Sequence, residues 1–252
     1  MKSIDILKDL DSKPYFKIIR NFKNQKNLKK TFYNFAQKLG KIVPQNKNNK
    51  KIVEIKPNLK KILKLKKKQT KIKSVLRYHQ TNLGGSIHSD GPQLSSPPKY
   101  IIMACEENSI KGGDTILVDA YKIYKYLFKN KKEILQVLKK KFLFERRGFA
   151  HSSNNVFSKP IFEVKNKKFL FRYLRDYIEK GYEIKKRRLS KNQLKAFEFL
   201  DSLLKNKNFY KKTKLNKGDL VILNNHKIAH GRTTFKIRSK GQQRKLYRIW
   251  LN

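Results

Sequence analysis

From Ser74 onwards the chain consists largely of short apolar runs separated by Gly, Pro, Asn and Ser. Runs of this length, bounded by turn-forming residues, are typical of β-strands. We expect strands at 100–105, 115–118, 142–144, 160–164, 168–173, 219–223 and 245–251. Many short strands with a few helices outside them favour a β-sandwich or jelly roll, so the predicted class is mainly β with flanking helices.

Helical patterns occur at a few places between these runs. Residues 120–140 have a helical pattern, and Ser190 with Gln193 forms a capping box that opens a second helix. On that helix Leu194, Phe197, Leu200 and Leu204 are expected to line one side.

The first part of the chain has a different pattern, predicted as strand 15–19, helix 28–39 and strand 51–55. Gly40 stands where a C-cap glycine is expected. A chain of 252 residues with 38% hydrophobic residues can form one sizeable core. We therefore expect a single domain over 1–252, with residues 1–73 as a lead-in and 74–252 as a jelly-roll core with helical insertions.

The formal net charge is +45. Such a charge attracts polyanions, which makes nucleic acid a partner to consider. However, the lysines are spread from end to end together with many Asn and Ile residues, as a coding bias towards A/T-rich codons would produce. A binding patch is expected to be concentrated on one face, and the run Lys60–Lys73 is the best candidate for an anion-facing strip.

Cys105 is the only cysteine, which excludes an intrachain disulfide and a zinc site of the CxxC type. It lies in an apolar run and is expected to be a packed thiol. The N-terminus carries charges throughout, and no apolar run approaches the length of a membrane span. We expect a cytoplasmic protein without a membrane segment; the oligomeric state is left open, and a homo-oligomer is compatible with the sequence.

A potential metal site combines two distant segments. His88 and Asp90 alternate in the run 84–91, so in an extended backbone both side chains project to one side. His230 follows the predicted strand 219–223. Two histidines and one carboxylate form the facial triad of non-haem iron(II) oxygenases, which leaves open positions on the metal. By itself the His-x-Asp triplet is a weak signal, and a surface turn is its more frequent explanation.

Three further residues accompany the triplet. Arg244 and Arg248 fall on one face of the last predicted strand, and burying two guanidinium groups is costly without anionic partners. A planar guanidinium can bind a carboxylate through two parallel hydrogen bonds, which would provide such a partner. The alternative is that both arginines reach the solvated rim of the protein. Thr115 follows the pair Gly112-Gly113 and Asp114, and its hydroxyl is placed to add a hydrogen bond to the same carboxylate.

In this combination the chain resembles the taurine dioxygenase and clavaminate synthase group of iron(II)/2-oxoglutarate oxygenases (TauD/TfdA-like). The matching stretches are His88-Ser89-Asp90-Gly91, Pro97-Pro98-Lys99-Tyr100, Gly112-Gly113-Asp114-Thr115, Lys217-Gly218-Asp219-Leu220, the run 225–235 and Arg244-Lys245-Leu246-Tyr247-Arg248. They stand in family order over 74–252, and the lead-in resembles the family more loosely.

The resemblance implies a double-stranded β-helix, a cupin-like jelly roll. It also implies that His88, Asp90 and His230 bind Fe(II), and that Thr115 and Arg244 hold the distal carboxylate of 2-oxoglutarate. Arg248 then faces the acidic group of the substrate or 2-oxoglutarate itself. With O2 as the second co-substrate, such enzymes release succinate and CO2 and hydroxylate a C–H bond. A carboxylate at Asp90 disfavours halogenation.

The implied substrate is a small polar metabolite with a carboxylate, such as an amino acid. Arg172, Tyr173 and Arg175 either approach this pocket or form a strand end with solvated arginines.

Three alternatives stay open. The net charge fits an oxidative demethylase acting on nucleic acid, although those enzymes carry an R-x-N-x-T-x-R signature that this chain lacks. The second alternative is a non-enzymatic polyanion-binding protein. The third is a zinc hydrolase, which would leave Arg244 and Thr115 without a role.

Overall fold

Two antiparallel sheets form the centre of the computed structural model, which describes residues 3–22, 27–67, 80–84, 86–147, 155–237 and 243–252. The larger sheet has the order β1 (Phe16–Ile19), β11 (Leu220–Asn224), β4 (Tyr100–Glu107), β13 (Lys245–Leu251) and β2 (Ile42–Val43), and β3 (Ile52–Ile55) also pairs with β13. The smaller sheet has the order β10 (Tyr210–Thr213), β5 (Thr115–Asp119) and β12 (Ile228–Arg232). This arrangement confirms the predicted mainly-β jelly roll.

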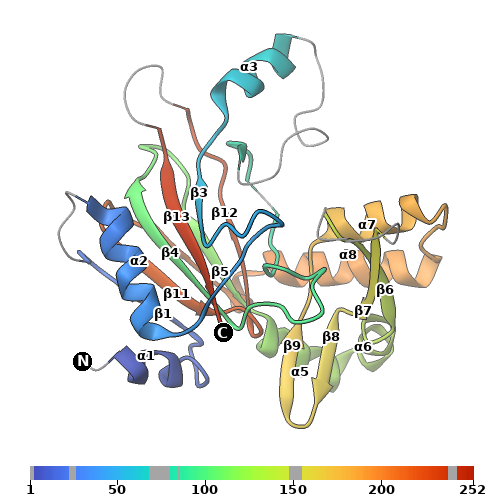
Figure 1. Ribbon diagram of the computed structural model, residues 1–252. Helices are drawn as coiled ribbons and strands as arrows, with labels where there is room; N and C mark the ends of the chain where they lie inside the picture. Colours follow the sequence, from blue (N-terminus) through green and yellow to red (C-terminus); the bar gives the residue numbers. More distant parts are fainter. Residues whose placement is uncertain (1–2, 23–26, 68–79, 85, 148–154, 238–242) are drawn as a thin grey trace.

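Strand β4 shows why the larger sheet is covered on both faces. Its alternate residues Ile101, Met103 and Cys105 pack in one apolar cluster with Leu117 and Ile228 of the smaller sheet. The residues between them pack in another cluster beneath α1 (Ser3–Asp9) and α2 (Leu28–Leu39), which lie on the outer face in Figure 1. A strand buried on both faces reads as a continuous apolar run, as 100–105 does.

The thiol of Cys105 lies between the two sheets and is fully buried. Burial raises its pKa to about 12, so the thiol stays protonated at neutral pH. The prediction of a packed thiol is confirmed.

The lead-in strands are part of the larger sheet. β1 pairs with β11, and both β2 and β3 pair with β13, so the first and last parts of the chain share one hydrogen-bonded layer. The prediction of strand, helix and strand in this region is confirmed, and β2 is a short addition that the sequence pattern did not indicate.

A second body of structure lies beside the sheets (Figure 1), and its apolar core also includes Val118 and Ala229 of the smaller sheet. It contains helices α5 (Ala120–Asn130), α6 (Lys132–Leu138), α7 (Arg175–Ile184) and α8 (Lys191–Lys205), the hairpins β6 (Lys141–Glu145) with β7 (Val156–Pro160) and β8 (Phe162–Lys165) with β9 (Lys168–Phe171), and the 3-10 turn η3 (Lys207–Phe209). The predicted capping box of Ser190 and Gln193 is present. Within the described residues, no helix combines the length and the apolar character needed to cross a membrane.

The single helix predicted over 120–140 is wrong, because the chain turns at Lys131 (φ −147°, ψ 60°). The buried residues Ile123 and Leu127 of α5 and Ile134 and Leu138 of α6 keep a helix-like spacing across this turn. Periodicity therefore could not show the break, which lets the two short helices pack on different parts of one core.

Three smaller expectations also need correction. Residues 160–164 are not one strand, since Ile161 separates β7 from β8 and its amide donates to the carbonyl of Leu138. Gly40 does end α2, but with extended φ (175°) rather than the left-handed conformation. Leu194 is 38% exposed, whereas Leu203, which was not predicted, is buried.

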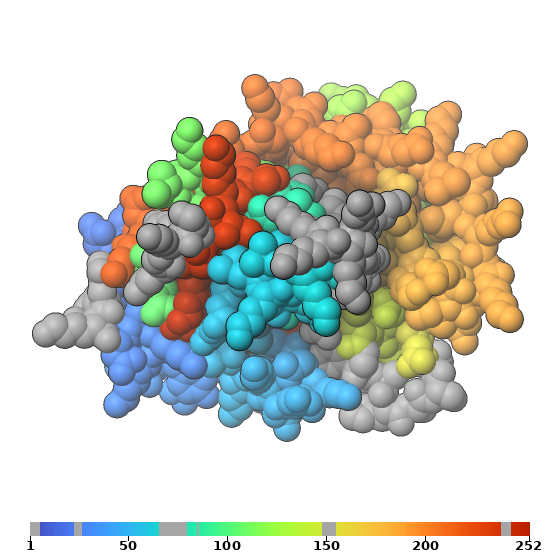
Figure 2. Space-filling model, turned by 90° about the horizontal axis from the view of Figure 1, so that it is seen from above, coloured from blue at the N-terminus to red at the C-terminus, as the bar shows by residue number. Residues whose placement is uncertain are grey.

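The basic run begins in α3 (Leu59–Lys67), and residues 68–73 lie outside the described part of the chain. Ile62 and Leu65 of α3 are buried against Ile237. In Figure 2 this region (cyan) lies between the C-terminal strand (red) and the helical layer (orange). The helix therefore uses its apolar side for packing, and its role as an anion-facing strip stays a prediction.

Candidate metal centre

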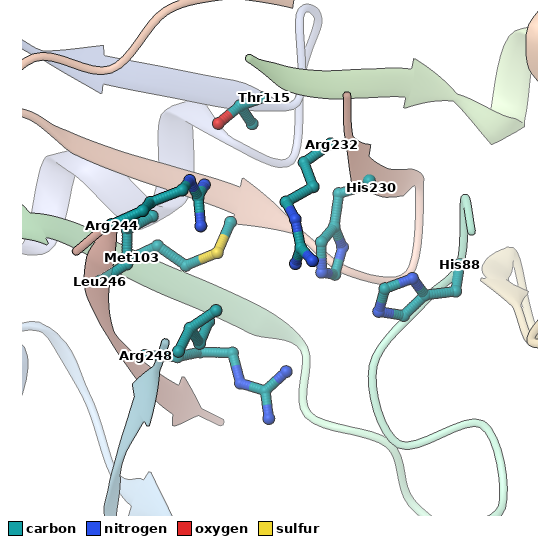
Figure 3. A pocket seen from close by; sticks show the side chains of 10 residues that line it. His88, Met103, Thr115, His230, Arg232, Arg244, Leu246 and Arg248 are labelled. Atoms are coloured by element: carbon teal, nitrogen blue, oxygen red, sulfur yellow. The ribbon is translucent and has the colours of Figure 1, made fainter. Parts of the chain in front are cut away.

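His88 and His230 come from two segments that pair directly with each other. The amide of each residue donates to the carbonyl of the other, at 2.9 and 2.7 Å, in an antiparallel bridge. His230 lies within β12, a strand that the sequence analysis did not predict. The two rings face each other with 4.6 Å between their centroids (Figure 3).

Asp90 completes the cluster. Its Oδ1 lies 3.6 Å from Nε2 of His88 and 3.9 Å from Nε2 of His230. One potential ligand atom of each residue lies within 4.8 Å of those of the other two. The three side chains are only 6–11% exposed. The structure therefore brings the predicted triad together in a site largely shielded from water.

The carboxylate of Asp90 has a separate partner for each oxygen. Nη1 of Arg248 donates to Oδ1 and Nε1 of Trp250 donates to Oδ2, each at 2.9 Å. Burial raises the pKa of Asp90, but the Arg248 guanidinium and the two imidazoles outweigh this effect and hold the pKa well below its usual range. Asp90 is therefore an ionised carboxylate at neutral pH.

The surroundings of the two imidazoles suit them to bind a metal. Burial, together with the neighbouring His88, lowers the pKa of His230 to about 3, although Asp90 acts in the opposite direction. Nδ1 of His88 lies 3.0 Å from the carbonyl of Ser86. A proton on that nitrogen would be donated to the carbonyl and would leave Nε2 with a lone pair for a metal.

The backbone of Asp90 is held by Asn225, which is fully buried at the end of β11. Oδ1 of Asn225 accepts from the amide of Asp90 at 2.8 Å, and its Nδ2 donates to the carbonyls of Asp90 at 3.0 Å and Pro98 at 2.9 Å. This one amide side chain fixes both ends of the Asp90 residue.

Arg172 fits neither of its two expected roles. It is 2% exposed and donates to the carbonyls of Leu94 (2.6 Å) and Ser95 (3.0 Å), so it holds the loop that follows Asp90 and is not solvated. Arg175 pairs with Glu179 and Asp201, and the buried Tyr173 also donates to Asp201. None of the three is among the residues that line the pocket next to the triad.

That pocket runs between the two sheets. Its lining includes His88, His230, Arg232, Thr115, Arg244, Met103, Leu246 and Arg248, which are labelled in Figure 3, together with Ile55 and Gly231. The predicted residues Thr115, Arg244 and Arg248 therefore share one cavity with the two histidines. Thr115 and Arg244 are 3% and 5% exposed, so Arg244 does not reach a solvated rim.

The Gly-Gly pair makes room for Arg244. Gly112 and Gly113 both have a φ of +74°, which favours glycine. A Cβ on Gly112 would lie 1.9 Å from the carbonyl oxygen of Thr234, and one on Gly113 would lie 3.1 Å from Nε of Arg244. Nε of Arg244 donates to Oδ1 of Asn108 at 3.2 Å. The tight turn thus positions both Thr115 and the guanidinium.

Several residues of the site were not predicted. Arg232 lines the pocket two residues after His230 and donates to the carbonyls of Thr81 (2.6 Å) and Leu83 (3.1 Å). Gln45 accepts from Nε of Arg248 at 2.8 Å. Asn225 and Arg232 stand inside the run 225–235 that carried the resemblance, so their spacing to His230 was an available signal. Gln45 comes from the loop after β2, and no local pattern marks it.

His226, the one further histidine in the described part of the chain, lies outside the cluster. Nε2 of His226 lies 3.2 Å from the carbonyl of Pro97, in agreement with a packing role. His79 and His151 fall outside the described residues.

Comparison with known proteins gives one consistent result. A family model described as "Taurine catabolism dioxygenase TauD, TfdA family" matches residues 13–250. A human gamma-butyrobetaine dioxygenase is 28% identical over 158 residues, which is 60% of this chain but only 40% of that protein.

Among solved structures, an asparagine oxygenase bound to Fe(II), 3-hydroxyasparagine and succinate superposes with a TM-score of 0.73 and 13% sequence identity. This match covers 99% of the present chain and 78% of the asparagine oxygenase chain. The non-haem iron oxygenase OrfP, bound to Fe and alpha-ketoglutaric acid, superposes with a TM-score of 0.67 and 14% sequence identity. This match covers 98% of the present chain and 79% of the OrfP chain. At these identities the structures show that the fold is shared.

Proposed function

Because this chain belongs to the TauD, TfdA family of dioxygenases, we propose that it is an Fe(II)- and 2-oxoglutarate-dependent dioxygenase that hydroxylates a C–H bond of a small polar substrate. The observation that carries the proposal is the placement of two kinds of side chain in one buried pocket. His88, Asp90 and His230 lie at one end, and Thr115 and Arg244 lie further along it.

The donor set fits ferrous iron. Two neutral imidazoles and one ionised carboxylate are the ligands of the facial triad, which leaves three positions for other ligands. When bound, iron with 2-oxoglutarate and O2 supplies the oxidising chemistry that yields succinate, CO2 and a hydroxylated product. The protein contributes placement and exclusion of water.

Thr115 and Arg244 are proposed to hold the distal carboxylate of 2-oxoglutarate. A guanidinium binds a carboxylate through two parallel hydrogen bonds, and Arg244 is buried where such a pair is shielded from water. The cation is also kept in place by Asn108 and lies over the ring of Phe235, with 5.5 Å between Cζ and the centroid. The guanidinium is thus oriented before the diacid arrives.

Arg248 is proposed to contact an acidic group of the substrate. It lines the pocket of the triad and also a second cavity of about 550 Å³ that opens near the edge strand β3. Lys29, Lys50 and Lys56 line this second cavity together with one acidic residue, Glu54. A mainly cationic approach to Arg248 favours a small carboxylate-bearing metabolite. The 3-hydroxyasparagine and (3S)-hydroxy-L-Arg ligands of the structural relatives make an amino acid the first class to test.

The metal and co-substrate sites are tested without any primary substrate. Under anaerobic conditions, Fe(II) and 2-oxoglutarate are expected to give a weak visible charge-transfer band. His88→Ala is expected to abolish this band, while His226→Ala serves as the matched control because His226 lies outside the triad. A band that survives His88→Ala would contradict the assignment of the metal site.

Substrate class is tested by succinate formation in the presence of amino acids, other small acids and methylated oligonucleotides. Stimulation by an amino acid or a small acid supports the proposal. Stimulation by oligonucleotides alone would instead support the nucleic-acid oxygenase. In either case, loss of the stimulation in Arg248→Ala with the charge-transfer band retained would assign Arg248 to the substrate.

The organisation of the protein is also part of the proposal. A single catalytic domain is supported by the pairing of β1, β2 and β3 with strands of the jelly roll. The cytoplasmic location and the oligomeric state stay predictions, which fractionation and sedimentation would test.

A further inference from the structure

The two oxygens of Asp90 have different surroundings. Oδ1 lies 3.6 and 3.9 Å from the two imidazole nitrogens and also accepts from Nη1 of Arg248 at 2.9 Å. Oδ2 instead accepts the indole N–H of Trp250 at 2.9 Å. An indole nitrogen is a donor only and cannot itself bind a metal. The hydrogen bond therefore distinguishes the oxygen that faces the histidines from the one that faces away.

Trp250 is held firmly enough to act as a fixed donor. It is 4% exposed and stands in β13, with Val43 paired on one side and Ile101 on the other. The guanidinium of Arg248 lies over its ring, with 5.3 Å between Cζ and the centroid. Sheet pairing and ring packing leave the indole little freedom to follow a rotating carboxylate.

The other end of Asp90 is equally constrained, because Asn225 binds both its amide and its carbonyl. With the backbone fixed by Asn225 and Oδ2 fixed by Trp250, the carboxylate is held in one orientation. From this geometry we infer that Trp250 is a positioning residue that limits Asp90 to a single metal-binding oxygen, Oδ1.

This inference rests on the proposed function, and it explains why only one oxygen of Asp90 should bind the metal. A triad that contributes one atom per residue leaves three positions on an octahedral metal. The proposed reaction needs all three, two for the keto-acid end of 2-oxoglutarate and one for O2. If Oδ2 also bound the metal, Asp90 would occupy one of these positions.

The chain offers an unusually clean test because Trp250 is its only tryptophan. Growth of a tryptophan auxotroph on β-(3-benzothienyl)alanine replaces this residue alone, with sulfur in the place of the N–H. The shape of the ring is kept and the donor is lost. Trp250→Phe is a second variant without the donor, and Tyr247→Phe is the matched control, because Tyr247 belongs to the apolar cluster on the outer face of the sheet.

Each protein is titrated with Co(II), and the visible absorption gives the Kd. Loss of a partner that orients a metal ligand typically costs about 10–100-fold in metal affinity, so we expect a weakening of this size in the isostere and in Trp250→Phe. Tyr247→Phe is expected to match the wild type. The thermal unfolding midpoint of the metal-free isostere is expected to stay close to that of the wild type.

Three results would overturn the inference. A Kd for the isostere within twofold of the wild-type value would show that the N–H does not position Asp90, while the proposed metal site would stand. Failure of the metal-free isostere to fold would show a structural role instead. Failure of the wild-type protein to bind Co(II) at all would contradict the proposed metal site and this inference together.

Discussion

The two ends of the pocket between the sheets have opposite electrostatic designs. At the triad end, the Asp90 carboxylate is neutralised in place by Arg248 and lies beside His230, whose pKa is held well below its usual value. At the other end Arg244 brings a cation, which donates to the neutral side-chain oxygen of Asn108. Arg232, which also lines the pocket, donates to the carbonyls of Thr81 and Leu83. A pocket of this kind suits a cation at one end and an anion at the other, which is what a metal-bound diacid presents.

Substitutions at the two ends of the pocket should therefore impair different binding steps. A change at the triad end should alter metal affinity, whereas a change at the arginine end should alter the KM for 2-oxoglutarate and leave metal affinity intact. Experiments in which one substitution moves both quantities would break this division.

The largest effect is expected for Asp90→Ala. The substitution removes the only acidic member of the triad and leaves Arg248, with its side chain 12% exposed, without its carboxylate partner. We expect metal affinity to fall by more than the roughly 10–100-fold typical of an outer-shell change, and turnover to become undetectable. Co(II) titration and succinate release measure the two quantities, and a Kd within tenfold of wild type would contradict the assignment.

Arg244→Lys tests the opposite end. Lysine keeps the charge but loses the planar pair of donors. Loss of one hydrogen bond to a charged group costs about 1.5–3 kcal/mol, so we expect the KM for 2-oxoglutarate to rise by at least about tenfold. The Kd for Co(II) is expected to stay unchanged. Lys245→Arg, the next residue on the opposite face of β13, is the control.

The pH dependence of the stability of the metal-free protein tests the surroundings of His230 at the triad end. The pKa of His230 is lowered to about 3 in the folded state, so the unfolded chain takes up the proton first. The stability due to neutral His230 is fully present above pH 6.5 and is lost as the pH falls below it, by about 1.4 kcal/mol per pH unit.

This pH effect is measured by urea unfolding with a chelator present at pH 7.5 and 5.5. The wild type is expected to lose about 1.4 kcal/mol more stability than His230→Gln between these pH values. Equal losses in the two proteins would show that His230 is not held neutral by its surroundings.

Thr115→Val is expected to give the smallest effect. It removes one hydroxyl from the lining of the pocket and keeps the shape of the side chain. One neutral hydrogen bond contributes about 1 kcal/mol, so the KM for 2-oxoglutarate should rise about fivefold. An unchanged KM would remove Thr115 from the co-substrate site and leave Arg244 as its anchor.

Local patterns in the sequence were sufficient for much of this structure. The bounds of β13 and the capping box of α8 were predicted from residues that lie next to each other in the chain. His88, Asp90 and His230 were also predicted, because residue type and order restrict them strongly. The common feature of these predictions is that the informative residues are close in sequence or chemically distinctive.

The expectations that failed depend on contacts between distant segments. The turn at Lys131 interrupts an unbroken apolar periodicity, and Arg172 is buried because the carbonyls of the loop 92–95 happen to surround it. The link between Trp250 and Asp90 joins residues 160 positions apart. No spacing rule connects such pairs, so only the folded arrangement reveals them.

The central claim is that one metal ion and one diacid span this pocket, and an anaerobic crystal structure with Mn(II) and 2-oxoglutarate tests it most directly. The account predicts a metal bound by His88, Asp90 and His230, with the distal carboxylate of 2-oxoglutarate on Arg244 and Thr115. A metal bound at other residues, or a diacid bound away from Arg244, would contradict it.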